Sequence, residues 1–406
     1  MAFNIALSGL NAASSDLEVT ANNIANTATT GFKGSRAQFA ELYNAAGRNL
    51  SATQTGSGVR LTAIAQQFSA GNVENTGNSL DFALSGDGFF TLHDSKGYSY
   101  TRAGAFGQDS NGFVVNPAGQ RLQVFPAVAG GSFDTSSMRD LQLTTAQSPA
   151  KATGSVQMSL NLPSDATAPV NAFDPTDALS YNQATPFTAY DSLGATHSGT
   201  VYFVKDAAAN GWSANLYVDG QAAGSQPLSF TTSGALAAPV GGKLTFGALS
   251  VSPGADPLTV GIDISKVTQF GNNYAVSSIN QDGYPTGTLS SIDVSTEGVV
   301  QAKFSNGQST ALGQLALANF SNLQGLRKLD NTNWAASYDS GTAVMGAAGS
   351  GTFANVQSGA LEASNTSDLT AQLVNMIKAQ RNYQANAQVI SADDKLTQTI
   401  IGITNG

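Results

Sequence analysis

The chain has 406 residues, a formal net charge of -9 and only 11% charged residues, against roughly 25% in an average globular protein. It has no cysteine, which excludes a disulfide scaffold, thiol catalysis and a zinc site built on thiolates. It also has no basic run and no apolar run of about 18 residues, so nucleic acid is a poor candidate partner and no membrane insertion is expected.

The N-terminal stretch has a regular apolar spacing. Positions on one side recur at alternating steps of four and three, which predicts an amphipathic helix ending near Asn26. Gly9 lies inside this helix and weakens it. The stretch lacks the basic start and the continuous apolar core of a secretory signal, so we expect any export to use another route. The predicted stripe consists of Phe3, Leu7, Leu10, Ser14, Leu17, Ala21 and Ile24.

The C-terminal stretch from Leu369 to Ile401 repeats this pattern without an interrupting Pro or Gly. Asp368 stands where a helix N-cap is expected. Beyond Ile390 the apolar positions shift by one residue and continue through Leu396, Ile400 and Ile403. The main stripe consists of Leu369, Leu373, Met376, Gln380, Tyr383, Ala387 and Ile390.

Two long amphipathic helices need a partner surface. Burying the five large apolar side chains of the first helix stabilises it by about 7–15 kcal/mol, whereas ordering its backbone costs about 24–48 kcal/mol. Intrahelical hydrogen bonds offset only part of this cost, so an isolated helix of this size is marginal. The stripes could pair within one chain or face other copies of it, and the periodicity favours neither. We hypothesise that both termini are largely disordered in a free monomer and become helical on assembly.

Between the two helices the apolar period becomes two and turn residues become frequent, which indicates short strands. The predicted fold class is α+β, with mainly-β domains nested between coiled-coil-like terminal helices. We expect four parts: a helical inner domain from 1–32 plus 364–406, a linker or arm from 33–71, a β domain from 72–148 plus 282–363, and an inserted outer β domain from 149–281. The arm contains a possible short helix around Ala37–Asn44 and a Gly-, Ser- and Thr-rich stretch at Gly47–Gly58.

No catalytic, metal-binding or cofactor-binding residues are predicted, and we expect no enzymatic activity. The two histidines, His93 and His197, have no His or Cys near them in the sequence, and exposed strand or loop positions explain them best. The run Gly86-Asp87-Gly88 lacks the alternating acidic residues of a calcium loop and is expected to be a tight turn. The pair Asp393-Asp394 is expected on a solvated helix face.

Several motifs together resemble the flagellar rod and hook axial proteins. At the N-terminus these are Ala21-Asn22-Asn23-Ile24-Ala25-Asn26 and Thr30-Gly31-Phe32-Lys33; in the β region, Leu80 to Leu84 and Tyr100-Thr101-Arg102-Ala103-Gly104; at the C-terminus, Met376 to Ala387. The runs Tyr190-Asp191-Ser192-Leu193-Gly194 and Gly359 to Asn365 are similar to the hook-forming branch. One departure is an additional residue between Ser364 and Leu369, which puts the entry into the last helix in question.

The resemblance implies a structural subunit that assembles helically into a hollow, curved and bendable tube, a universal joint outside the cell that transmits torque from rod to filament. It implies as partners other copies of the chain, the distal rod protein, the hook cap and hook–filament junction proteins, and the flagellar type III export apparatus. A distal rod or junction protein, and a secreted β-rich adhesin of another class, remain alternatives. The expected self-assembly interface consists of Phe3, Leu7, Leu10, Leu17, Asn22, Asn23, Ile24, Asn26, Leu369, Leu373, Met376, Ile377, Gln380, Tyr383, Ala387 and Ile390.

Overall fold

A computed structural model of the chain describes residues 2–42, 56–128, 130–143 and 147–404. The chain divides into two compact units, each built from stretches that are separated in the sequence. The first comprises Met1–Thr144, Ser291–Ala302 and Ser309–Gly406, and the second comprises Thr145–Ser290 and Lys303–Gln308. A long helix stands near each end of the chain, and strands fill the sequence between them, so the predicted α+β class is confirmed. The finer division into four parts stays a proposal.

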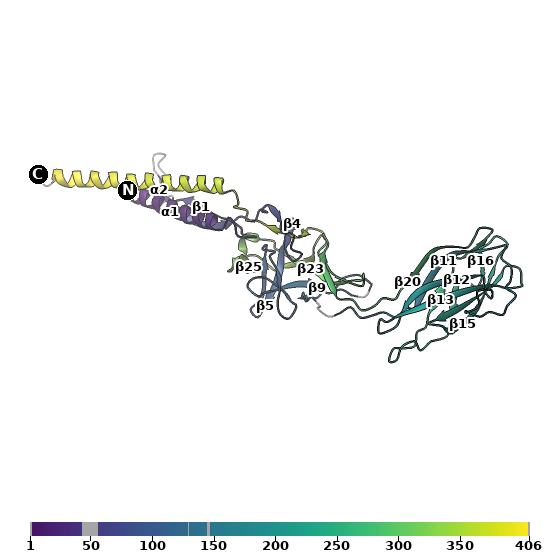
Figure 1. Cartoon of the computed structure of the whole chain (residues 1–406). Coiled ribbons are helices and arrows are strands. Elements are labelled where there is room, and N and C mark those ends of the chain that lie inside the picture. Colours follow the sequence, from purple (N-terminus) through teal and green to yellow (C-terminus); the bar gives the residue numbers. More distant parts are fainter. Residues whose placement is uncertain (1, 43–55, 129, 144–146, 405–406) are drawn as a thin grey trace. The chain divides into compact units, whose positions relative to one another are not determined.

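Both predicted terminal helices are present. Helix α1 spans Ala2–Ala25 and helix α2 spans Leu369–Thr404. They lie side by side in the first unit, and α2 runs on past the N-terminal end of α1 (Figure 1). The backbone N–H of Ala371 donates to Asp368 Oδ1 over 3.1 Å, so the predicted N-cap of α2 is confirmed and the additional residue before it is accommodated.

The described part of the predicted arm forms a hairpin rather than a helix. Strand β1 (Ser35–Glu41) pairs antiparallel with β2 (Val59–Gln66). The predicted short helix around Ala37–Asn44 is therefore wrong over its described part, because pairing with β2 satisfies the backbone and Ala37 is buried. Residues 43 and 44, and 47–55 of the Gly-rich stretch, lie outside the described residues. The Val59 N–H donates to Ser8 Oγ over 3.1 Å, which ties the hairpin to α1.

A large, mostly antiparallel sheet organises the β part of the first unit. Its main path follows the order β21, β22, β23, β9, β5, β6, β25, β24. Further strands pair beside this path or form small separate ladders, and 3-10 helix η1 (Leu323–Gly325) follows β23. The strands are β3 (Val73–Asn75), β4 (Phe82–Ser85), β5 (Phe89–Asp94), β6 (Gly97–Thr101), β7 (Gly107–Gln108), β8 (Val114–Val115), β9 (Arg121–Phe125), β10 (Arg139–Asp140), β21 (Leu289–Val294), β22 (Val299–Phe304), β23 (Ser309–Asn319), β24 (Arg327–Lys328), β25 (Asn333–Ala335), β26 (Val344–Ala347), β27 (Asn355–Ser358) and β28 (Ala360–Glu362).

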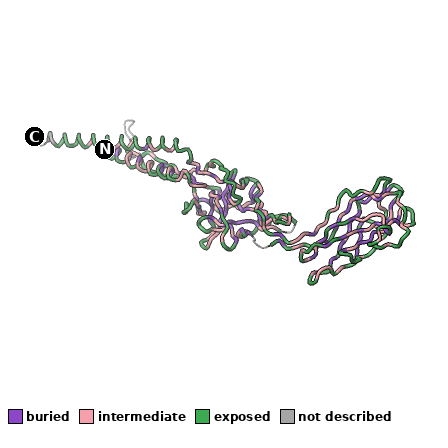
Figure 2. The backbone as a smooth tube through the Cα atoms, viewed as in Figure 1, coloured by how far each residue is buried: buried purple, intermediate pink, exposed green. Residues whose placement is uncertain are grey.

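The core of this β part is aromatic and aliphatic. Phe82, Phe90 and Phe106 pack ring against ring at centroid distances of 5.6–6.4 Å, and Leu84 and Leu92 lie in the same buried cluster. Burial follows the strands of this core, whereas α2 keeps most of its residues exposed and α1 is partly covered (Figure 2). The β part can therefore fold around its own core, while the helices depend on further contacts.

The second unit is built from two sheets. One orders β17 (Lys243–Thr245), β18 (Gly261–Asp263), β11 (Ser155–Pro163) and β19 (Thr268–Phe270), with β20 (Ala275–Gln281) beside β11; the other orders β12 (Gln183–Tyr190), β13 (Thr196–Lys205), β14 (Gly211–Val218), β15 (Gln221–Phe230) and β16 (Leu236–Ala238).

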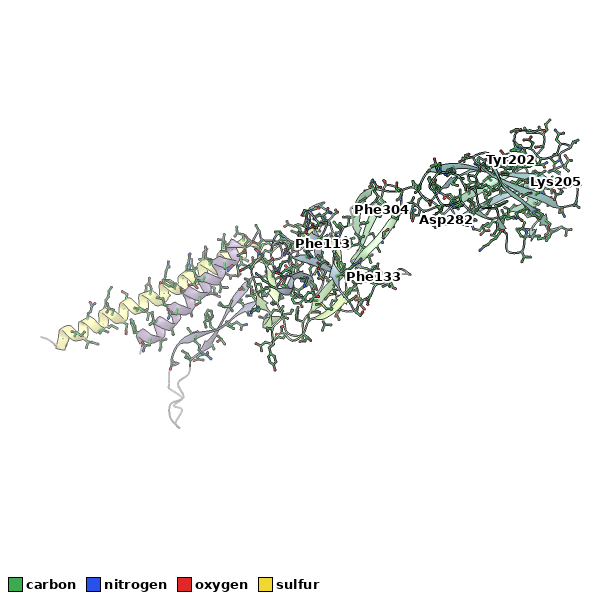
Figure 3. The ribbon with its side chains drawn as sticks, turned by 90° about the horizontal axis from the view of Figure 1, so that it is seen from below. Phe113, Phe133, Tyr202, Lys205, Asp282 and Phe304 are labelled. Atoms are coloured by element: carbon green, nitrogen blue, oxygen red, sulfur yellow. The ribbon has the colours of Figure 1, made fainter. Side chains whose placement is uncertain are left out.

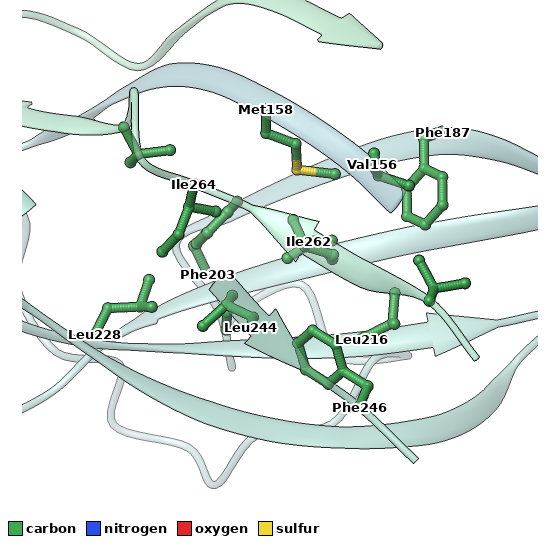
Figure 4. Packing of buried hydrophobic residues seen from close by; sticks show 14 of the residues in the cluster. Val156, Met158, Phe187, Phe203, Leu216, Leu228, Leu244, Phe246, Ile262 and Ile264 are labelled. Atoms are coloured by element: carbon green, nitrogen blue, oxygen red, sulfur yellow. The ribbon is translucent and has the colours of Figure 1, made fainter. Parts of the chain in front are cut away.

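The core of this unit is filled by every second side chain along its strands. Along β11, Val156, Met158, Leu160 and Leu162 are buried and the residues between them are not, as period two requires. Figure 4 shows Val156 and Met158 packed with Phe203, Leu216 and other core residues. Each fully buried side chain of this size stabilises the unit by about 1.5–3 kcal/mol.

Asp219 and Gly220 form a tight hairpin turn, as an Asp-Gly pair between two strands favours. Both residues have positive φ (47° and 78°), and they connect β14 to β15 in the two-residue turn that matches strand twist. At the other end of β14, Lys205 (Figure 3) donates to the carbonyl oxygens of Asp206, Ala208 and Gly211 over 2.9–3.1 Å. These bonds hold the preceding turn in place.

Candidate functional site

Helix α1 presents small residues to α2. Ala6, Ala13 and Thr20 are buried and stand seven residues apart. Gly9 lies against α2, because a Cβ atom built on it would meet the side chain of Asn386, with Oδ1 at 2.6 Å. Gly9, which the sequence suggests only as a weak point, therefore leaves room for the Asn386 side chain between the helices.

Part of the predicted stripe of large residues on α1 points away from the buried small residues. Leu7, Ser14 and Ala21 each follow a buried small residue by one position, which is about 100° around a helix, whereas Leu10, Leu17 and Ile24 each follow one by four positions, which is about 40°. Phe3 is 44% and Leu7 39% exposed, and Leu10, Leu17 and Ile24 are only partly buried. We call Phe3, Leu7, Leu10, Leu17 and Ile24 the apolar stripe; one chain covers these side chains incompletely, although Val19 on the same helix is buried.

Helix α2 divides its predicted stripe between two directions. Met376, Ala387 and Ile390 are partly buried, together with Gln372 and Asn386, and Ala379 is fully buried. The other predicted residues, Leu369, Leu373, Ile377, Gln380 and Tyr383, are exposed, as are Leu396, Ile400 and Ile403 near the end of the helix. The periodicity therefore identified the helix. However, the side of α2 that is covered within one chain lies about one residue away from several predicted positions.

The three predicted asparagines act within the chain. Asn23 is buried, its Nδ2 donates to the Ser35 carbonyl oxygen over 2.8 Å, and its Oδ1 accepts from the Ser35 N–H over 2.9 Å. Asn26 Nδ2 donates to the side chain and the carbonyl oxygen of Asn22. Asn23 therefore fixes the exit of α1 to β1, and its place in the assembly interface stays a prediction.

A buried ion cluster of Lys33, Arg102 and Glu362, which we call the joint cluster, lies where the helices meet the β part of the first unit. Lys33 Nζ lies 2.5 Å from Glu362 Oε1, and Arg102 Nη1 lies 3.4 Å from Glu362 Oε2. Lys33 follows α1, Arg102 follows β6, and Glu362 ends β28 just before α2. The cluster therefore connects three segments that are remote in the sequence.

Backbone groups complete the joint cluster. Lys33 Nζ donates to the Ser69 carbonyl oxygen over 2.8 Å, Arg102 Nη2 donates to the Gly86 carbonyl oxygen over 2.8 Å, and the Gly71 N–H donates to Glu362 Oε1 over 2.8 Å. Burial lowers the pKa of Lys33 and of Arg102, and their attraction to Glu362 opposes that shift. Loss of Glu362 would leave two cations in a desolvated site.

Gly31 allows the backbone after α1 to pack directly against the backbone at Ala103 beside the joint cluster. Its φ is +65°, its N–H donates to the Glu362 carbonyl oxygen over 2.7 Å, and an added Cβ would lie 2.4 Å from the Ala103 backbone nitrogen. A backbone contact of this kind cannot be relieved by turning a side chain. The Thr30-Gly31-Phe32-Lys33 motif is therefore a structural requirement of the joint.

We expect Gly31→Ala to destabilise the first unit by about 1–3 kcal/mol more than a matched control, because it adds overpacking to the strain of a positive φ. The control is Gly77→Ala, since Gly77 also has positive φ (73°) but no heavy atom within 4 Å of an added Cβ. Urea denaturation measures both variants. Equal unfolding midpoints would contradict the proposed close approach.

The structure also shows the segments that the sequence did not assign to a functional site. Gly86 and Gly88 have positive φ (121° and 127°), so the expected tight turn at Gly86-Asp87-Gly88 is confirmed. Among the described residues, no group of three or more His, Cys, Asp or Glu residues is arranged to hold a metal ion, and no helix is long and apolar enough to cross a membrane. His197 corrects an expectation, because it is buried rather than exposed.

Four family models match the chain in order. Residues 3–33 match the flagella basal body rod protein model, and 83–168 match the flagellar hook protein FlgE/F/G D1 domain. Residues 161–284 match the flagellar basal body protein FlaE D2 domain, and 357–403 match the flagellar basal body rod FlgEFG protein C-terminal model. These models cover both helices and parts of both compact units.

Whole-chain comparison decides which protein of this group the chain resembles. It is 39% identical to the flagellar hook protein FlgE of Salmonella typhimurium over 99% of this chain and 100% of the relative. The chain belongs to the flagellar hook protein family. The hook protein of Escherichia coli is 38% identical, with 99% and 100% covered, and that of Borreliella burgdorferi is 32% identical, with 98% of each covered.

A solved structure agrees in fold. The crystal structure of Helicobacter pylori flagellar hook protein FlgE2 aligns with a TM-score of 0.51 at 13% identity, covering 70% of this chain and 99% of that chain. The full-length matches to hook proteins identify the chain as a structural subunit of the flagellar hook rather than a rod protein, a junction protein or an adhesin. In this hook subunit, three of the motifs that first suggested the family each supply one member of the joint cluster.

Proposed function

We propose that the hook subunit assembles through its terminal helices into a hollow, curved and flexible helical tube that acts as a universal joint. The observation that carries this proposal is the position of the apolar stripe, which the chain leaves incompletely covered while small residues make the contact between α1 and α2. Exposed apolar rows of this length favour burial against a partner, and repeated contacts between different surfaces generate open helical assemblies. That partner is another copy of the chain.

The hairpin β1–β2 adds a second candidate surface. Phe39 and Leu61 are cross-strand partners, and both are exposed together with Ile64. We include this face in the assembly surface, as the arm that touches neighbouring subunits. Ordering of both termini on assembly remains part of the same proposal.

The joint cluster and the outer surfaces have different roles in this proposal. Buried, hydrogen-bonded ion pairs fix the helices to the β part of the first unit, so torque passes between them without slippage. The remaining surface has few charges and many hydroxyl and amide groups. Shallow polar contacts can exchange as neighbouring subunits slide, whereas strong ion pairs would hold them in one register.

The proposed partners follow from this role. Besides copies of itself, the subunit contacts the distal rod protein at one end of the tube and the hook cap or hook–filament junction proteins at the other. We propose an extracellular location, reached through the flagellar type III export apparatus without a cleaved signal peptide. No catalytic activity is proposed.

We expect a chain that lacks residues 152–283 to polymerise still, but into tubes of altered curvature. The cut ends can be joined by a short Gly-Ser linker, because Lys151 and Tyr284 exchange backbone hydrogen bonds of 3.0 Å. Electron microscopy of concentrated protein, with the full chain as control, measures both assembly and shape. A folded variant that forms no polymer would contradict the assignment of assembly to the helices.

A further inference from the structure

A buried histidine in the second unit is held between two carboxylates. His197 Nδ1 lies 2.6 Å from Asp219 Oδ2, and His197 Nε2 lies 3.2 Å from Asp191 Oδ2. The His197 side chain is 6% exposed and that of Asp191 is fully buried, whereas the Asp219 side chain is 42% exposed. Both ring nitrogens can donate at once only when the imidazole is protonated.

The three residues belong to separate segments. Asp191 follows β12, His197 stands on β13, and Asp219 is in the turn between β14 and β15. Ser252, in the loop between β17 and β18 of the other sheet, places its Oγ 3.4 Å from His197 Nε2. The imidazole therefore connects the two sheets of the unit at one point.

This arrangement resembles a Ser-His-Asp triad, but its electrostatics oppose that chemistry. Burial alone would lower the pKa of His197, yet its hydrogen bonds to Asp219 and Asp191 outweigh burial and raise the pKa above its ordinary value. A general base must accept a proton from its serine, whereas the two carboxylates favour the protonated ring, which cannot accept one. The cluster is therefore built to hold a proton.

The carboxylates keep their charge under the same conditions. Burial would raise the pKa of Asp191, but hydrogen bonds from Ser252, the Ala195 N–H, His197 and the Leu193 N–H lower it to about 2. Burial would likewise raise the pKa of Asp219, but hydrogen bonds from His197 and from the Ser198 N–H outweigh burial and lower it. Among the described residues, the charged groups that act on the His197 ring are Asp219 and Asp191.

We propose that His197 is a proton-operated clasp that holds this end of the second unit closed when protonated and releases it when the proton is lost. Because the folded pKa exceeds the ordinary histidine value of 6.5, the clasp's stabilisation is fully present below about pH 6.5 and is lost as pH rises through the folded pKa. The lowered carboxylate pKa values add stability above about pH 4, which is lost at lower pH. The clasp thus stays closed below the folded pKa of His197 and opens above it.

The chain permits a direct test, because it contains only two histidines. In a His93→Gln variant every histidine NMR signal comes from His197, and the cluster itself is unaltered. We expect its ring protons to titrate with a midpoint above 6.5. Asp219→Asn, at the partly exposed end of the cluster, should lower that midpoint. A midpoint at or below 6.5 in the His93→Gln variant would overturn the proposal.

Hydrogen exchange tests the opening itself. Amide protection of residues 190–200 and 219–221, corrected for the intrinsic pH dependence of exchange, should fall several-fold as pH passes the measured midpoint. In a His93→Gln/His197→Gln variant the protection should be lower and should not change across that range. Protection that is equally constant with His197 present would show that the proton operates no clasp.

Discussion

Leu7→Glu combined with Leu10→Glu is expected to abolish tube formation while leaving the monomer folded. Each of these side chains, once covered by another subunit, stabilises the contact by up to about 1.5–3 kcal/mol. A carboxylate in the same place is buried without a partner at a cost of several kcal/mol. The effect recurs at every subunit, because every contact in a homopolymer is repeated. Within one chain, Leu7 is exposed and Leu10 only partly buried, so folding changes little.

The matched control is Asn11→Glu combined with Asn4→Glu. Both asparagines are exposed on α1. They do not belong to the apolar stripe, although each neighbours Leu7 on the helix surface, three residues before it and four after it. The helix and the number of added charges are the same in both variants. Sedimentation and electron microscopy at equal protein concentration compare the variants with the unaltered chain. Tubes from the Leu7→Glu/Leu10→Glu protein, or equal loss of tubes in the control, would argue against burial of the stripe.

The second large effect is expected from Glu362→Ala, which should destabilise the first unit by about 3–5 kcal/mol. Breaking a buried ion pair from one side leaves the other charge uncompensated, and here both Lys33 and Arg102 lose their carboxylate. The Gly71 N–H also loses its acceptor. The damage should concentrate at the joint, so helix packing weakens together with the β part of the unit.

Denaturation can be followed in one unit at a time. Trp334 and Trp212 are buried in the first and second units, so a Trp212→Phe background reports on the first unit alone by fluorescence. Glu74→Gln, an exposed glutamate on β3 beside β28, is the control for loss of a charge. A Lys33→Met/Glu362→Leu variant should recover part of the loss. If Glu362→Ala unfolds at the same urea concentration as Glu74→Gln, the joint cluster does not hold the helices.

The repeating patterns predicted the elements of the fold well. Heptad spacing located α1 and α2 because a helix face needs nothing but its own sequence. Alternation located β13 and β14, and Asp219-Gly220 located the turn that follows. Around Ala37 the pattern failed, because pairing with β2, on the far side of residues 43–55, decides that segment.

The contacts between remote segments could not be predicted in the same way. Lys33 and Glu362 are 329 residues apart, and nothing in either local sequence indicates their pairing. The α1 face toward α2 also lacked a signal, because Ala6, Gly9 and Ala13 pack by being small rather than by being strongly apolar. His197 was expected to be exposed, since neither of its carboxylate partners is recognisable from strand patterns alone.

The most direct test of the account is a side-chain-resolution density map of the assembled tube by electron cryo-microscopy. We predict that residues of other subunits cover Phe3, Leu7 and Leu17 in this map, while Gly9 still faces Asn386 of its own chain. Large side chains of α1 that remain open to solvent in the polymer, or that turn onto their own α2, would contradict it.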